Sequence, residues 1–207
     1  MIEVKEFPEL MFDERKHIYM VNGLFVPSVT TVMRPLSEDV YGSIDEEVLN
    51  RAAARGTAVH NAIENYIKFD IRDIPEEHEG YFEAFLKWFE EHKVKPYGDE
   101  VRLYHKSLMY AGTADMFAGV DEVDTLIDFK TSAAVQKMLC GVQLEAYDRA
   151  IQSHTGGKGF ERKAIVHLKK DGSYQMIEYG SNDMECWRVF TALLTVRNYK
   201  LKFKQGG

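Results

Sequence analysis

The spacing of apolar residues changes along this chain from a helical period to an alternating one, and this change limits the fold more than any other feature. Helical spacing predicts two helices, at about 45–69 and 76–92. Alternation then predicts three strands, around 100–105, 112–117 and 125–131. The chain therefore mixes helices with strands.

The second half of the chain continues this mixture without strict alternation of strand and helix. Helices are predicted at about 135–151 and 184–203, and strands at 162–168 and 174–179. This order favours an α/β (α+β) fold in which helices flank a central mixed β-sheet.

The N-terminal residues predict a β-hairpin followed by helices. Residues 17–26 form the hairpin, because Asn22-Gly23 is a strong turn signal between two short strands. Ser28 is expected to cap a short helix that Pro35 ends, and Asp45 is expected to cap the long helix.

Length and composition bound the class of protein. With 207 residues, 45% of them hydrophobic, we expect a single domain, 1–207, with the hairpin and helices in about 1–95 and the core in about 96–207. There is no membrane-length apolar run and no signal peptide is expected. Two cysteines, Cys140 and Cys186, indicate no disulfide framework, which fits a cytoplasmic protein.

The strand at 125–131 carries the first candidate for chemistry. Asp128 and Lys130 are two residues apart, so both side chains point to one face, while Phe129 points to the other. They form either a simple salt bridge or a metal ligand beside a group that acts on water. Asp115, in the preceding strand, either joins Asp128 at a site for Mg²⁺ or Mn²⁺ or accepts hydrogen bonds near a turn.

Two helices carry further candidates. His60 and Glu64 share one face of the long helix, in which Gly56 suggests close packing or a close backbone approach. Gln143 and Tyr147 share one face of a later helix. Each pair also fits an ordinary amphipathic helix.

The candidate residues lie in four successive motifs: Arg55-Gly-Thr-Ala-Val-His60, Gly112-Thr-Ala-Asp115, Leu126-Ile-Asp128-Phe-Lys130-Thr131 and Gln143-Leu-Glu-Ala-Tyr147. Their order and spacing resemble the RecB-type and phage-type exonuclease branch of the PD-(D/E)XK nucleases. The resemblance covers about residues 10–150 and implies a restriction-endonuclease-like core.

The resemblance also implies roles for single residues. Asp115, Asp128 and His60 would bind one or two Mg²⁺ or Mn²⁺ ions, together with the backbone carbonyl of Phe129, and Lys130 would be the catalytic lysine. Supporting or DNA-contacting roles fall to Glu64, Glu100, Gln143 and Tyr147. The two cysteines exclude a four-cysteine iron–sulfur cluster within one chain. Gly156-Gly157-Lys158-Gly159 lacks the Ser or Thr of an ATP-binding loop.

The implied activity is a metal-dependent DNA exonuclease of phage or prophage recombination or repair, acting with a strand-annealing protein. The alternatives are a structure-specific or nicking endonuclease on the same fold, and a DNA-binding module without catalysis. The net charge of −7 divides into −12 for residues 1–150 and +5 for residues 151–207. Basic residues are therefore the candidate phosphate contacts: Arg55, Arg162, Lys163, Lys169, Lys170, Arg197 and Lys200.

Overall fold

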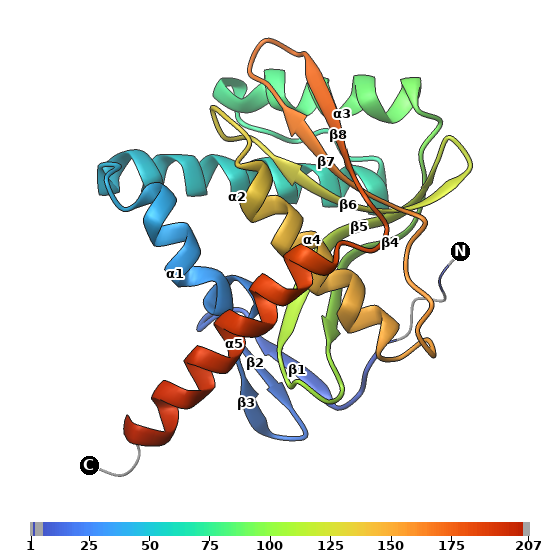
Figure 1. Ribbon diagram of the computed structural model, residues 1–207. Helices are drawn as coiled ribbons and strands as arrows, with labels where there is room; N and C mark the ends of the chain where they lie inside the picture. The colour runs from blue at the N-terminus through green and yellow to red at the C-terminus, as the bar shows by residue number, and fades with distance from the viewer. Residues whose placement is uncertain (1, 3–5, 205–207) are drawn as a thin grey trace.

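The computed structural model describes residue 2 and residues 6–204, and it begins with a small antiparallel sheet. Its three strands, in the order β1-β2-β3, are β1 (Leu10–Asp13), β2 (Ile18–Val21) and β3 (Leu24–Val26) (Figure 1). The predicted hairpin is β2 and β3, and both turn residues have positive φ, 51° at Asn22 and 76° at Gly23. Strand β1 was not predicted, because residues 14–17, which join it to β2, contain no turn signal like Asn22-Gly23.

A five-stranded mixed sheet forms the centre of the described residues, as predicted. Its strands, in spatial order, are β4 (Lys95–Tyr104), β5 (Ala111–Val120), β6 (Val123–Lys130), β7 (Arg162–Leu168) and β8 (Tyr174–Tyr179). Strands β6 and β7 are parallel, and the other neighbours are antiparallel. Helix α4 (Lys137–Gln152) forms the crossover that a parallel pair requires.

Helices cover both faces of this sheet (Figure 1). Helices α1 (Val29–Tyr41), α4 and α5 (Met184–Lys204) pack on one face around a core that includes Phe117, Leu126 and Phe190. Helix α2 (Glu46–Phe69), a short 3₁₀ turn (Glu76–His78) and α3 (Glu79–Glu91) cover the other, around Phe85 and Phe129. None of the helices in the described part of the chain has the length and apolarity needed to cross a membrane.

Helix starts agree with the sequence prediction, and one helix end does not. The Ser28 hydroxyl accepts a hydrogen bond from the Thr31 N–H at 3.0 Å, and the Asp45 carboxylate accepts one from the Glu47 N–H at 2.8 Å. Pro35 does not end α1, which continues to Tyr41. An internal proline costs about 3 kcal/mol. Leu36, Val40 and Tyr41 offset this cost, because they pack against the first core beyond the proline.

Candidate active site

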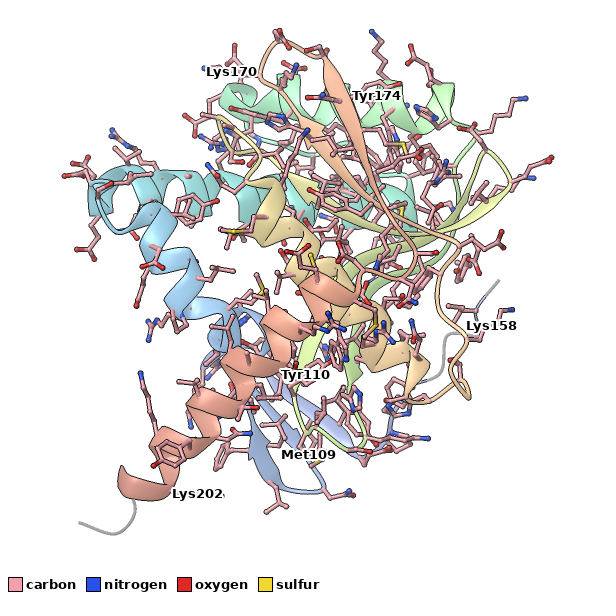
Figure 2. All side chains as sticks on the ribbon, viewed as in Figure 1. Met109, Tyr110, Lys158, Lys170, Tyr174 and Lys202 are labelled. Carbon is pink, nitrogen blue, oxygen red and sulfur yellow. The ribbon has the colours of Figure 1, made fainter. Side chains whose placement is uncertain are left out.

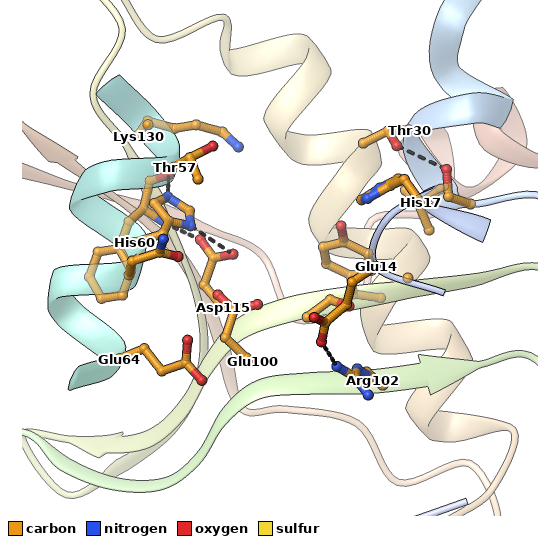
Figure 3. Close-up of a pocket in the computed structure, with 18 of the residues that line it drawn as sticks. Glu14, His17, Thr30, Thr57, His60, Glu64, Glu100, Arg102, Asp115 and Lys130 are labelled. Atoms are coloured by element: carbon orange, nitrogen blue, oxygen red, sulfur yellow. Dashed lines mark hydrogen bonds and ion pairs between the residues drawn. The ribbon is translucent and has the colours of Figure 1, made fainter. Parts of the chain in front are cut away.

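A cavity of about 790 Å³ lies between the N-terminal sheet, α2 and the first three strands of the central sheet (Figure 3). Strand β6 ends at this cavity, so its last residues point into a space that α2 and β5 also reach. The charged and imidazole side chains that line it are Glu14, His17, Arg55, His60, Glu64, Glu100, Arg102, Asp115 and Lys130.

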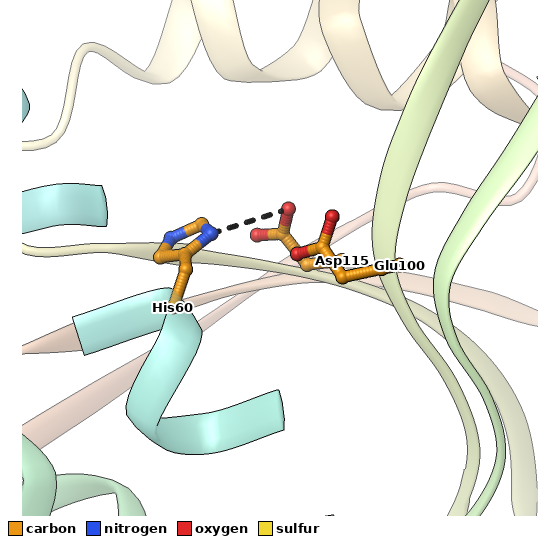
Figure 4. Close-up of side chains that lie close together, drawn as sticks. All are labelled: His60, Glu100 and Asp115. Carbon is orange, nitrogen blue, oxygen red and sulfur yellow. Dashed lines mark ion pairs between the residues drawn. The ribbon is translucent and has the colours of Figure 1, made fainter. Parts of the chain in front are cut away.

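Three of these side chains converge: His60 from α2, Glu100 from β4 and Asp115 from β5 (Figure 4). One ligand atom from each lies within 4.8 Å of the others. Glu100 lies opposite Asp115, because the flanking pairs Asp99–Met116 and Val101–Ala114 set the register.

The backbone at Glu100 departs from strand geometry. Its φ of 47° lies in the left-handed region, which costs a non-glycine residue about 1–2 kcal/mol. Such conformations persist only where the surrounding structure holds them, and they are common at functional sites.

The backbone of Phe129 contacts His60 and Asp115, which with Glu100 form the trio of converging side chains. The Phe129 N–H donates to Asp115 Oδ2 at 2.7 Å, and the Phe129 carbonyl lies 3.2 Å from His60 Nε2. A proton on Nε2 leaves the lone pair on Nδ1, which lies 3.6 Å from Asp115 Oδ1. This is the arrangement in which histidine ligates metals, with the other ring nitrogen bonded to a carbonyl. The Phe129 carbonyl, predicted as a metal ligand, contacts His60 Nε2 and so orients the imidazole ring.

The trio fits a divalent cation by its donor set and its electrostatics. Burial, followed by the nearby Asp115 carboxylate, raises the pKa of Glu100 to about 7. Two carboxylates that repel each other in a half-buried site favour a bound cation. One imidazole and two carboxylates suit a divalent metal ion.

Asp128 and Lys130 share one face of β6, as the period-two pattern predicts, and they form an ion pair with 2.6 Å between Lys130 Nζ and Asp128 Oδ2. Gln143 bridges this pair: its Nε2 donates to Asp128 Oδ1 at 2.9 Å, and its Oε1 accepts from Lys130 at 3.2 Å. The Tyr147 hydroxyl lies 3.2 Å from Gln143 Nε2. The four predicted residues therefore form one hydrogen-bonded chain.

The position of Asp128 differs from the expectation of a shared metal site. Its side chain is 3% exposed and its carboxylate is engaged by Lys130 and Gln143. Among the described residues, the metal-compatible group contains Glu100 in its place. Glu100, expected in a minor role, thus supplies the third carboxylate or imidazole group of the trio.

Lys130 remains charged at neutral pH. Burial alone would lower the pKa of the Lys130 ammonium, but the Asp128 and Asp115 carboxylates raise it above its usual value. Its side chain is 29% exposed and lines the cavity, so the charge is available to a bound anion. A lysine held this way acts through its charge rather than as a base.

Three residues of α2 that the sequence analysis singled out line the cavity without joining the trio. Glu64 pairs with Lys68 at 2.5 Å. Arg55 Nε lies 3.5 Å from the Thr131 hydroxyl, and its guanidinium lies 5.4 Å from the Tyr81 ring centre. The close packing predicted at Gly56 is not observed, because a Cβ there would meet only the Thr131 hydroxyl, at 3.9 Å.

The structure buries one predicted phosphate contact and engages a second within the fold. The Lys163 side chain is 1% exposed, and its ammonium is paired with the buried Glu145. Arg162 is held by the carboxylate of Glu178 at 3.1 Å and by the Val120 carbonyl at 2.6 Å. Its neighbour in the register is Thr125, at the end of β6 away from Lys130. Both residues therefore serve the fold.

Of the other predicted phosphate contacts, Arg55 lines the cavity and the remaining four do not. Lys169 and Lys170 lie at the turn between β7 and β8, and Arg197 and Lys200 lie on α5. Figure 2 shows Lys170 at that turn, and it shows Lys202 near the far end of α5. The structure brings neither group to the trio.

Sequence reasoning missed Arg102, which lines the cavity two residues after Glu100. The alternation of β4 was the signal that could have found it, because residues two apart share a face.

Comparisons with known proteins give a weak result. No protein-family model and no curated protein matches the chain. Among solved structures, an alkaline exonuclease (LHK-Exo) from Laribacter hongkongensis is 13% identical, with a TM-score of 0.40, and the match covers 74% of this chain and 90% of that one. LHK-Exo in complex with dAMP is 12% identical, with a TM-score of 0.43 and coverage of 86% and 89%. SSO0001 is 15% identical, with a TM-score of 0.45 and coverage of 86% and 76%. Scores at this level assign neither a family nor a function.

Proposed function

We propose that the chain is a metal-dependent nuclease that hydrolyses phosphodiester bonds in DNA. The observation that carries the proposal is the convergence of His60, Glu100 and Asp115 in a cavity that Lys130 also lines. These three residues would hold Mg²⁺ or Mn²⁺. Such an ion, when bound, polarises a phosphate and lowers the pKa of water.

The other residues have roles that follow from their contacts. Lys130 presents a fixed positive charge to the cavity, where it stabilises negative charge that develops on a phosphate during hydrolysis. Asp128 and Gln143 hold the Lys130 ammonium in place. Tyr147 supports Gln143, and it packs so closely that a Cβ on Gly112 would lie 2.6 Å from its ring.

The finer proposal is an exonuclease, and it rests on the resemblance of the motifs alone. The same resemblance supports a cytoplasmic setting in phage or prophage recombination or repair, with a strand-annealing protein as partner. A vestigial DNA-binding module is disfavoured, because Asp115, Asp128 and Lys130 are all present.

Cleavage of linear and closed circular duplex DNA, with Mg²⁺, Mn²⁺ or EDTA, tests the proposal. We expect linear DNA to be degraded with metal, and cleavage to be lost in EDTA and in Lys130→Ala. The exposed Lys158→Ala is the matched control and should keep full activity. Cutting of the closed circle would replace the exonuclease by an endonuclease. A folded protein that binds Mn²⁺ and cleaves neither DNA would contradict the nuclease proposal.

A further inference from the structure

Arg102 is a cation of the cavity that belongs neither to the trio nor to the hydrogen-bonded chain of Asp128, Lys130, Gln143 and Tyr147. Arg102 lies on β4, two residues after Glu100, and its side chain is 47% exposed. Both residues line the same cavity, and Figure 3 shows Arg102 and Glu14 on the opposite side from His60 and Lys130. Arg102 therefore faces the cavity at a distance from the trio.

A stack of rings supports the Arg102 guanidinium. It lies 5.1 Å from the centre of the Phe12 ring, and Phe12 stacks on Tyr19 with 4.4 Å between ring centres. Tyr19 is anchored in turn, because its hydroxyl lies 2.8 Å from that of Thr113 on β5. The guanidinium thus lies over an anchored aromatic ring, and its Nη2 donates to an acceptor.

That acceptor is an exposed carboxylate. Arg102 Nη2 donates to Glu14 Oε1 at 2.8 Å, and the Glu14 side chain is 75% exposed. An exposed ion pair of this kind favours the paired over the unpaired state by about five-fold at most. A phosphate group binds a guanidinium edge with the same geometry and a greater charge. Glu14 therefore stands where a phosphate oxygen would bind.

We propose that Arg102 binds a phosphate group of the nucleic acid away from the cleaved bond, and that Glu14 stays paired with Arg102 until this phosphate displaces the Glu14 carboxylate. The inference rests on the proposed function, since it assumes a nucleic acid in the cavity. It accounts for how a cavity rich in acids admits a polyanion. The carboxylates of Glu14, Glu64, Glu100 and Asp115 line the cavity beside three Lys and Arg side chains. Release of Glu14 frees one of these cations.

Binding of a fluorescent single-stranded oligonucleotide, measured by anisotropy with Ca²⁺ at several salt concentrations, tests the inference. Arg102→Gln should weaken binding about ten-fold and reduce the salt slope by about one. Glu14→Gln should tighten binding by up to about five-fold, because it removes the competing charge. Arg102→Lys should restore only part of the affinity, since an ammonium lacks the planar edge.

Arg34→Gln is the matched control, because it breaks an exposed ion pair outside the cavity, with 3.6 Å between Arg34 and Glu38. It should change affinity by less than about two-fold. Unchanged affinity and salt slope in a folded Arg102→Gln protein, or weaker binding in Glu14→Gln, would overturn the inference.

Two arms of the assay separate the sources of the phosphate. If Arg102→Gln weakens only an oligonucleotide that carries a terminal phosphate, Arg102 binds a terminal phosphate. If it weakens oligonucleotides with and without one equally, Arg102 binds a phosphate within the chain. The readout needs no cleavage. An inactive protein with the expected binding pattern would contradict only the nuclease proposal, and an active protein whose binding ignores Arg102 would contradict only this inference.

Discussion

Replacement of Lys163 by methionine tests whether this lysine stabilises the fold or contacts DNA. The Lys163 ammonium is paired with Glu145, and the side chains are 1% and 0% exposed. Removing one partner of such a pair costs about 3–5 kcal/mol, because a charge is left buried without compensation. Here Arg149 Nε also contacts Glu145, at 2.7 Å, and the Asp183 N–H donates to Glu145 at 3.1 Å. These contacts remain, so we expect the lower end, about 3 kcal/mol.

Urea unfolding followed by circular dichroism measures this loss. Lys158→Met, on an exposed loop, is the control and should change the free energy of unfolding by less than about 0.5 kcal/mol. The DNA affinity of folded Lys163→Met should stay within about two-fold of the wild type. A loss of less than about 1 kcal/mol, or a large loss of DNA affinity in the folded variant, would refute the reasoning.

Three further predictions concern stability. Gly56→Ala should stabilise α2 by up to about 1 kcal/mol, since the added Cβ has room and alanine favours helix. The midpoint of thermal unfolding should therefore rise, and a lower midpoint would contradict the prediction. Gly80→Ala should destabilise by about 2 kcal/mol or more in the same assay, because its Cβ would overlap the backbone carbonyl of Lys170; an unchanged midpoint would contradict this packing. Burial, followed by the charge of a nearby histidine, lowers the pKa of His105 to about 4. Two backbone N–H groups donate to its Nδ1 at 3.2 Å, which protonation there would prevent. The unfolded chain then binds more protons, so stability should fall as pH drops from about 6.5 to about 4. Because solvent screens this half-buried group, the loss should be about 1–2 kcal/mol. In His105→Gln this part of the pH dependence should be absent.

The pairing of Asp128 with Lys130 on one face could be predicted because side-chain direction in a strand follows a period of two. The mixed sheet could be predicted because strands and helices follow one another without strict alternation. Those patterns depend only on local sequence, which fixes the type of element and the face of each side chain.

Three features of the structure depend on tertiary contacts. The left-handed conformation of Glu100 leaves no mark in the sequence, yet it belongs to the trio that excludes Asp128. Lys163 has the sequence appearance of a surface cation, but β7 lies inside the sheet with helices over both faces, so its ammonium meets Glu145 from α4. Arg102 acquires its setting only when β1 brings Phe12 and Glu14 beside β4.

Calorimetric titration of Mn²⁺ into the wild type and three variants tests the central claim most directly. The trio predicts that Asp115→Asn and Glu100→Gln each weaken Mn²⁺ binding by about ten-fold or more, because each removes a ligand charge. Asp128→Asn, whose carboxylate faces Lys130 and Gln143, should weaken it by less than about five-fold. Absence of Mn²⁺ binding by the wild type at millimolar metal, or a loss caused by Asp128→Asn but not by Glu100→Gln, would contradict the claim.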